Sequence, residues 1–325
     1  MLRGLVGFAL ALACLTLAAE PGRADAGAAP LVLERTIALA GVVGRIDNMA
    51  YDPRRQRLLV AEFGNGSLDV IDVAAARPVH RITGLAEPQG VAYASAADAI
   101  LVACGGDGTV RLFNAETFAP LGVIALGADA DDAAPDPGSG RIVVGFGSGG
   151  LAVIDPVRRA VTATVRLAAH PEAFRLSTDG ARAFVNVPDA REIAVVDLRS
   201  GQPIASWKIA GLRTNFPMAL DGAVLAVVFR DPPRLVAIDA ADGSVIAQLA
   251  TCRDADDVFF DPARHRLYVS CGDGNVDVVQ RDGAALRAMA RVATAPGART
   301  SLFVPAPDRL FVAAPAAILV FRPAP

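Results

Sequence analysis

The sequence predicts an all-β protein, a seven-bladed β-propeller with four antiparallel strands per blade. Three observations predict it. Short apolar strands recur at a fixed period, each is followed by a glycine-rich turn and an alternating strand, and no long segment has the 3.6-residue apolar period of an amphipathic helix. Hydrophobic residues make up 53% of the 325 residues and charged residues only 20%, which excludes intrinsic disorder and implies a large core.

The repeat is clearest in the second, valine-rich strand of each unit. Its central residues, spaced 41 to 43 positions apart, are Val60, Val102, Val144, Val185, Val227, Val269 and Val312. Seven units of about 42 residues fill nearly the whole chain, and four strands at this period are typical of a propeller blade. We therefore expect a single domain over residues 27–325.

Each unit has the same order of elements. The first strand often ends in Asp-Pro, as at 49–53, and the valine-rich strand follows. A glycine-rich turn such as 272–275 then joins it to an alternating strand ending near Asp, and an outer strand such as 161–167 completes the unit. On the face opposite the glycine-rich turns, aspartates are expected to cap tight turns: Asp52, Asp72, Asp136, Asp155, Asp197, Asp239 and Asp261.

The two ends of the repeat array complement one another. The last unit supplies only three strands, whereas residues 31–39 form a lone strand ahead of the first complete unit. We expect this strand to complete the seventh blade from outside, which closes the ring and removes its open edges.

The N-terminus has the pattern of a secretory signal peptide over residues 1–26. Arg3 precedes an apolar run over 4–19, and Ala24-Asp25-Ala26 is a small-x-small cleavage site. The run is too short to span a bilayer, so we expect a soluble periplasmic or secreted protein with no membrane insertion after cleavage. Of the three remaining cysteines, Cys252 and Cys271 lie on the same face of the sixth blade; whether they form a disulfide is left open.

The repeat resembles the secreted propellers with YVTN-type repeats, often called YncE-like. The resemblance covers all seven units, and the motif is best kept in Tyr268-Val269-Ser270-Cys271, although the family's Asn at the fourth position is absent from every unit. It implies the propeller fold. It does not specify the chemistry, because that fold carries lactonases, redox enzymes and binding platforms.

The mouth of the central channel is the expected functional site. Aligning the units places one residue per blade at the same level of the ring: Asp47, Gln89, Asp131, Glu172, Phe216, Asp256 and Thr300. Neighbouring positions add further polar residues, which are Arg45, Asp129, Asp132, His170, Asn215, Asp254, Asp257 and Arg299. We expect a polar, net acidic mouth.

These residues suggest two functions. The first is a binding or scaffold protein that holds a cation, a small ligand or a partner segment, with candidate contacts from Asp47, Gln89, Asp131, Glu172, Asn215, Asp256 and Arg299. The second is a metal-dependent, lactonase-like hydrolase. In it Asp47, Asp131, Glu172 and Asp256 hold Ca²⁺ or Mg²⁺, because hard cations prefer oxygen ligands, and His170 moves protons.

Two further observations bear on these two hypotheses. Carboxylates at such positions also cap turns or face solvent without binding anything. A formal charge of −3, a pI of about 5.7 and one tryptophan, Trp207, argue against nucleic acid as a partner. No cofactor beyond such an ion is implied, and the ligand, protein partner and oligomeric state stay open.

Overall fold

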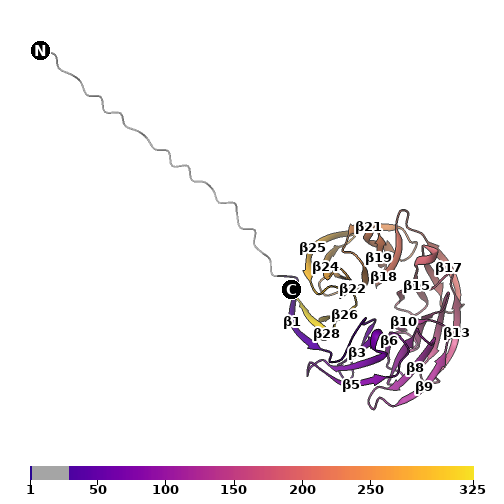
Figure 1. The fold of residues 1–325 in the computed structure, drawn as a ribbon. Coiled ribbons are helices and arrows are strands. Elements are labelled where there is room, and N and C mark those ends of the chain that lie inside the picture. Colours follow the sequence, from indigo (N-terminus) through magenta and orange to yellow (C-terminus); the bar gives the residue numbers. More distant parts are fainter. Residues whose placement is uncertain (2–28) are drawn as a thin grey trace.

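The computed structural model describes Met1 and residues 29–325; the expected signal peptide, apart from Met1, lies outside the described residues. Seven four-stranded antiparallel sheets surround one axis (Figure 1). This confirms the fold class expected from the sequence. None of the helical segments in the described residues is long and apolar enough to cross a membrane.

The blades are numbered in chain order. In blades one to six the first strand of the blade lies nearest the axis, and in blade seven the innermost strand is β26 (Ser301–Val304) (Figure 1). Blades one and two contain β2 (Met49–Asp52), β3 (Arg57–Glu62), β4 (Ser67–Asp72), β5 (Arg77–Thr83), β6 (Pro88–Ala94), β7 (Ala99–Cys104), β8 (Thr109–Asn114) and β9 (Pro120–Ala125). Blades three and four contain β10 (Ala130–Pro135), β11 (Ile142–Phe146), β12 (Gly150–Asp155), β13 (Ala160–Arg166), β14 (Phe174–Leu176), β15 (Arg182–Val187), β16 (Glu192–Asp197) and β17 (Gln202–Trp207).

Blades five and six contain β18 (Arg213–Asp221), β19 (Val224–Asp231), β20 (Pro233–Asp239), β21 (Val245–Ala250), β22 (Ala255–Asp261), β23 (Arg266–Cys271), β24 (Asn275–Asp282) and β25 (Ala285–Ala293). Blade seven contains β26 (Ser301–Val304), β27 (Arg309–Ala314), β28 (Ala317–Pro323) and β1 (Leu31–Ala38). In the described part of the chain, the helical segments are two 3₁₀ turns, η1 (Phe63–Asn65) and η2 (Pro188–Ala190).

The N-terminal strand closes the ring as the sequence predicts. Strand β1 pairs antiparallel with β28 and lies outermost in the sheet β1-β28-β27-β26. Blade seven is therefore assembled from both ends of the described chain.

The apolar core lies between the blades rather than on the axis. Leu101 of blade two packs with Ile142 of blade three, and Leu58 of blade one packs with Phe311 of blade seven. Corresponding clusters lie between the other neighbouring blades. The second strands are buried along their length, as in β7, because neighbouring blades cover both of their faces. Because the apolar side chains pack between the blades, the innermost strands can carry polar side chains on the side that faces the axis.

The turns on the face opposite the mouth depend on aspartate caps. Each of the seven predicted aspartates accepts a backbone N–H from two or three residues further on, at 2.7 to 3.0 Å. Arginines in two of these turns also join neighbouring blades: Arg264 bonds Asp261 in its own turn and Asp308 of blade seven, at 2.9 and 2.8 Å. The structural role predicted for these aspartates is confirmed.

Candidate functional site

A cavity of about 750 Å³ lies on the propeller axis, between the inter-blade loops and the innermost strands. We call it the axial cavity. All seven positions aligned by the repeat line it, namely Asp47, Gln89, Asp131, Glu172, Phe216, Asp256 and Thr300. The positions that the repeat aligns are thus brought together around one cavity.

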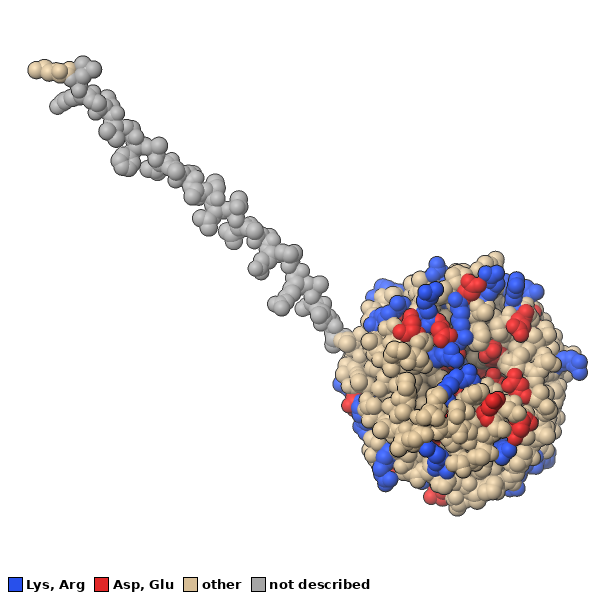
Figure 2. All heavy atoms as spheres, viewed as in Figure 1, with Lys and Arg blue, Asp and Glu red and all other residues tan. Residues whose placement is uncertain are grey.

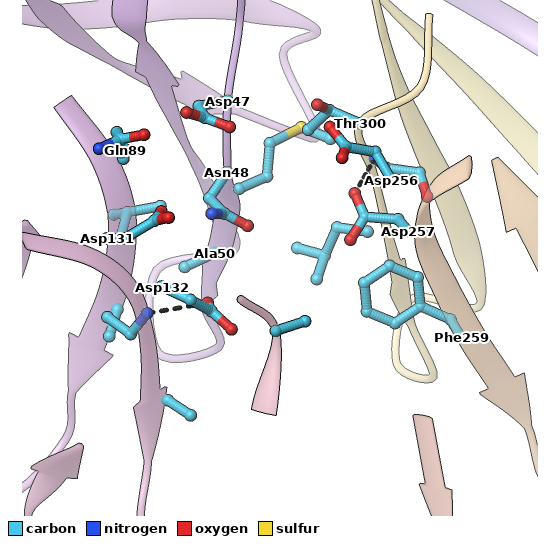
Figure 3. Close-up of a pocket in the computed structure, with 18 of the residues that line it drawn as sticks. Asp47, Asn48, Ala50, Gln89, Asp131, Asp132, Asp256, Asp257, Phe259 and Thr300 are labelled. Atoms are coloured by element: carbon cyan, nitrogen blue, oxygen red, sulfur yellow. Dashed lines mark hydrogen bonds between the residues drawn. The ribbon is translucent and has the colours of Figure 1, made fainter. Parts of the chain in front are cut away.

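Bulges explain why two consecutive aspartates face the axis in blades three and six. In a regular strand, neighbouring side chains point to opposite faces. The pairing register shifts between Ala130 and Ala133 in β10 and between Ala255 and Asp257 in β22, so Asp131-Asp132 and Asp256-Asp257 all line the cavity. Figure 3 shows Asp132 and Asp257 pointing into the cavity from opposite walls.

Arginines supply counter-charges to three of the carboxylates that line the axial cavity. Arg45 bonds Asp47 at 2.5 Å, and Asp256 is paired with both Arg230 and Arg299, the latter at 3.0 Å. Arg175 approaches Asp132 at 3.9 Å. The lining therefore holds six carboxylates and four guanidinium groups, and Figure 2 shows both signs around the central opening.

Two of these arginines were not singled out from the sequence. Arg175 lies in β14, where the two-residue alternation from Ala173 places it toward the axis. Arg230 follows the apolar run of β19 and stacks on Phe216, with its guanidinium carbon 3.8 Å from the ring centre. Extending the unit alignment to the ends of the first two strands would have found both.

The four carboxylates proposed to hold a metal do not gather at one point. Among the described residues, no three of Asp47, Asp131, Glu172 and Asp256 bring ligand oxygens within 4.8 Å of one another. They are spread around the ring instead, each on a different blade. This spacing does not fit a Ca²⁺ or Mg²⁺ ion coordinated by all four, because oxygen ligands lie about 2 to 2.6 Å from such ions.

Burial and mutual repulsion raise the pKa of several of these carboxylates above its ordinary value. Burial raises the pKa of Asp47 to about 7, with Asp131 and Asp256 adding to the rise against Arg45. It also raises the pKa of Glu172 to about 7, again with Asp131. Burial raises the pKa of Asp132 and, together with Asp256, raises that of Asp257 well above the usual range. The cavity is therefore poised to gain or lose protons near neutral pH.

His170 lies beside the axial cavity, not in its lining. Nδ1 bonds the carbonyl oxygen of Gly147 at 2.6 Å, and Nε2 lies 3.4 Å from Asp131. The bond to Asp131 raises the pKa of His170 to about 9, so the ring is an imidazolium at neutral pH. In that form the ring carries a proton that it can donate, and it accepts one only after losing it.

Three other candidates also lie outside the lining. Asn215 is buried inside the propeller wall, where its amide nitrogen donates to the side-chain oxygen of Asn186 and to the carbonyl of Glu192. Asp129 and Asp254 have φ angles of 35° and 56°, a left-handed conformation that aspartate tolerates. They shape the loops that carry the lining aspartates.

The disulfide left open by the sequence is present. Cys252 and Cys271 are joined, with Cα atoms 5.9 Å apart and both residues buried. The bond ties the loop before β22 to the end of β23, directly beside Asp254 and Asp256. Such a bond points to an oxidising compartment.

Comparisons with known proteins identify the fold alone. No family model matches, and no curated protein matches. Among 1746 matching chains of solved structures, a chain of hydrazine synthase from Kuenenia stuttgartiensis has a TM-score of 0.75 and 16% identity, covering 86% of this chain and 96% of that one. A chain of a mitotic checkpoint complex has a TM-score of 0.78 and 15% identity, covering 98% and 99%. So widespread a fold does not indicate a function.

Proposed function

We propose that this protein is a ligand-binding propeller of the periplasm or the extracellular space, and that its axial cavity binds a small organic cation. The predicted signal peptide and the Cys252–Cys271 disulfide support the compartment. The YncE-like resemblance is compatible with the propeller fold. The proposed function rests on the axial cavity.

The observation that carries the proposal is the distribution of charge. Six carboxylates line the axial cavity without converging, and Glu172 forms no ion pair or side-chain hydrogen bond with the other described residues. Dispersed carboxylates suit a cation with several donors or a broad surface better than a bare metal ion. An ammonium group near Glu172 would favour its ionised form and offset the burial and the repulsion from Asp131 that raise its pKa.

The rest of the wall suits the hydrocarbon part of such a ligand. Met49, Tyr51, Phe259 and Leu302 also line the cavity. A volume of about 750 Å³ lies within the range of sites for small molecules, which combine apolar walls with a few polar groups. A folded partner protein would not enter it.

We do not extend the proposal to the lactonase-like hydrolase. Its four metal ligands do not converge in the described structure. No specific observation favours that activity over binding.

Calorimetry with the mature protein tests the proposal. We expect hexylamine or spermidine to bind near neutral pH, and Glu172→Gln to weaken that binding about tenfold through loss of one charge-assisted contact. Glu116→Gln is the matched control, because Glu116 is exposed on the opposite face and pairs with Arg55. The proposal fails if no amine binds, or if the two variants affect binding equally.

A further inference from the structure

A second cavity of about 320 Å³ shares two wall residues, Arg45 and Arg299, with the axial cavity. We call it the outer cavity. The rest of its lining is mainly small or apolar: Gly44, Ile46, Asp254, Gly297, Ala313, Ala314 and Pro315. The two cavities are therefore neighbouring compartments with a pair of arginines between them.

The proportion of acidic to basic side chains differs between the two compartments. Apart from the shared arginines, the axial cavity has six carboxylates and two guanidinium groups, those of Arg175 and Arg230. The outer cavity has both shared arginines and one carboxylate, Asp254. That carboxylate is already paired with Arg299 at 3.1 Å and with Arg230 at 3.6 Å. A ligand lying across both would meet acidic groups at one end and basic groups at the other.

The shared arginines retain N–H groups for an incoming anion. Arg45 uses Nη2 for Asp47 and Gln89, and Arg299 uses Nε for Asp256 and Nη1 for Asp254. Within the described residues, Nε and Nη1 of Arg45 and Nη2 of Arg299 have no hydrogen-bond partner. The guanidinium carbon of Arg45 also lies 4.4 Å from the centre of the Phe63 ring, which holds the group in place.

We infer that the ligand is a zwitterion whose ammonium group lies in the axial cavity and whose carboxylate binds between Arg45 and Arg299, with an apolar chain joining the two. This inference rests on the proposed function and specifies its ligand class. Guanidinium groups bind carboxylates through paired, charge-assisted hydrogen bonds, which gives the anionic end its recognition.

Three probes of equal chain length separate the contributions of the two ends. Hexylamine carries the cation alone, hexanoate the anion alone, and ε-aminocaproate carries both. Calorimetry on the mature protein should show ε-aminocaproate binding about tenfold more tightly than hexylamine, and hexanoate binding most weakly.

Variants then locate the anionic end. Arg45→Gln should remove the advantage of ε-aminocaproate over hexylamine. Hexylamine itself should bind at least as tightly as before, because Asp47 then lacks its arginine partner. The Arg45 side chain is 41% exposed, so its loss is not expected to unfold the protein, and circular dichroism checks this. Arg54→Gln is the matched control, because Arg54 is an exposed arginine in the Asp52 turn on the opposite face.

The outcomes distinguish this inference from the proposed function. If hexylamine binds and ε-aminocaproate gains nothing, the inference is wrong and organic-cation binding stands. The inference is also wrong if the gain survives Arg45→Gln or if hexanoate binds best. If none of the probes binds, both the inference and the proposed function are wrong.

Discussion

Replacing Glu172 by glutamine tests whether the axial carboxylates are held partly protonated. Burial, with repulsion from Asp131, raises the pKa of Glu172 from its ordinary 4.5 to about 7. The folded protein therefore binds this proton more strongly than the unfolded chain does. The resulting stability is complete below about pH 4.5 and is lost as the pH rises through about 7, where folding must keep a buried charge.

The magnitude follows from the size of the rise. A difference between 4.5 and about 7 corresponds to about 3 kcal/mol for a fully desolvated group, and water in an open cavity reduces this to about 1 to 3 kcal/mol. Glutamine stays neutral at every pH. We expect Glu172→Gln to be more stable than the wild type at about pH 8, with a melting temperature about 2 to 5 °C higher, and to show no gain at about pH 4.

Thermal unfolding followed by circular dichroism at the two pH values measures the effect. Glu116→Gln is again the control, because hydrogen bonding to Arg55 lowers the pKa of exposed Glu116, and its replacement should bring no gain in alkali. A change in melting temperature for Glu172→Gln that is equal at both pH values, or a loss of stability at about pH 8, would refute the assignment of a buried, protonated Glu172.

Three further substitutions test the framework. Arg264→Ala should cost about 3 to 5 kcal/mol in unfolding by urea, because it leaves the buried carboxylate of Asp261 without its cation; a cost below about 1 kcal/mol would contradict this. Replacing Cys252 and Cys271 together by serine should lower stability by about 3 kcal/mol, and a reductant should destabilise the wild type but not the variant. Gly243→Ala should lower the melting temperature, since φ there is 79° and an added Cβ would lie 2.4 Å from the indole ring of the single tryptophan; unchanged melting would exclude that packing.

The fold could be predicted because every blade repeats the same sequence pattern. The valine-rich strands at a period of about 42 residues and the capping aspartates each specify one strand or turn, and closure by β1 followed from the strand missing in the last unit. Seven repetitions leave little freedom in aligning the units. That is why the alignment could select one residue per blade that lines the axial cavity, Asp47 and Asp256 among them.

The electrostatics of the site could not be predicted in the same way. The sequence indicated a cluster of carboxylates but not which arginine pairs with each of them. Arg230, for example, forms an ion pair with Asp256 from a different blade. The bulges that turn both Asp131 and Asp132 toward the axis depend on strand pairing. Asn215 was assigned to the mouth by position, although its amide bonds inside the wall.

Closure of blade seven by β1 has a consequence for how the molecule assembles. The seventh sheet needs Leu31–Ala38 beside Ala317–Pro323, so its outermost strand waits for a partner that is made only after six complete blades. Without blade seven, the other six blades would leave an apolar flank uncovered at each end. We therefore expect the ring to gain much of its stability when β1 joins β28, and a chaperone that shields the two flanks to raise the yield of native protein.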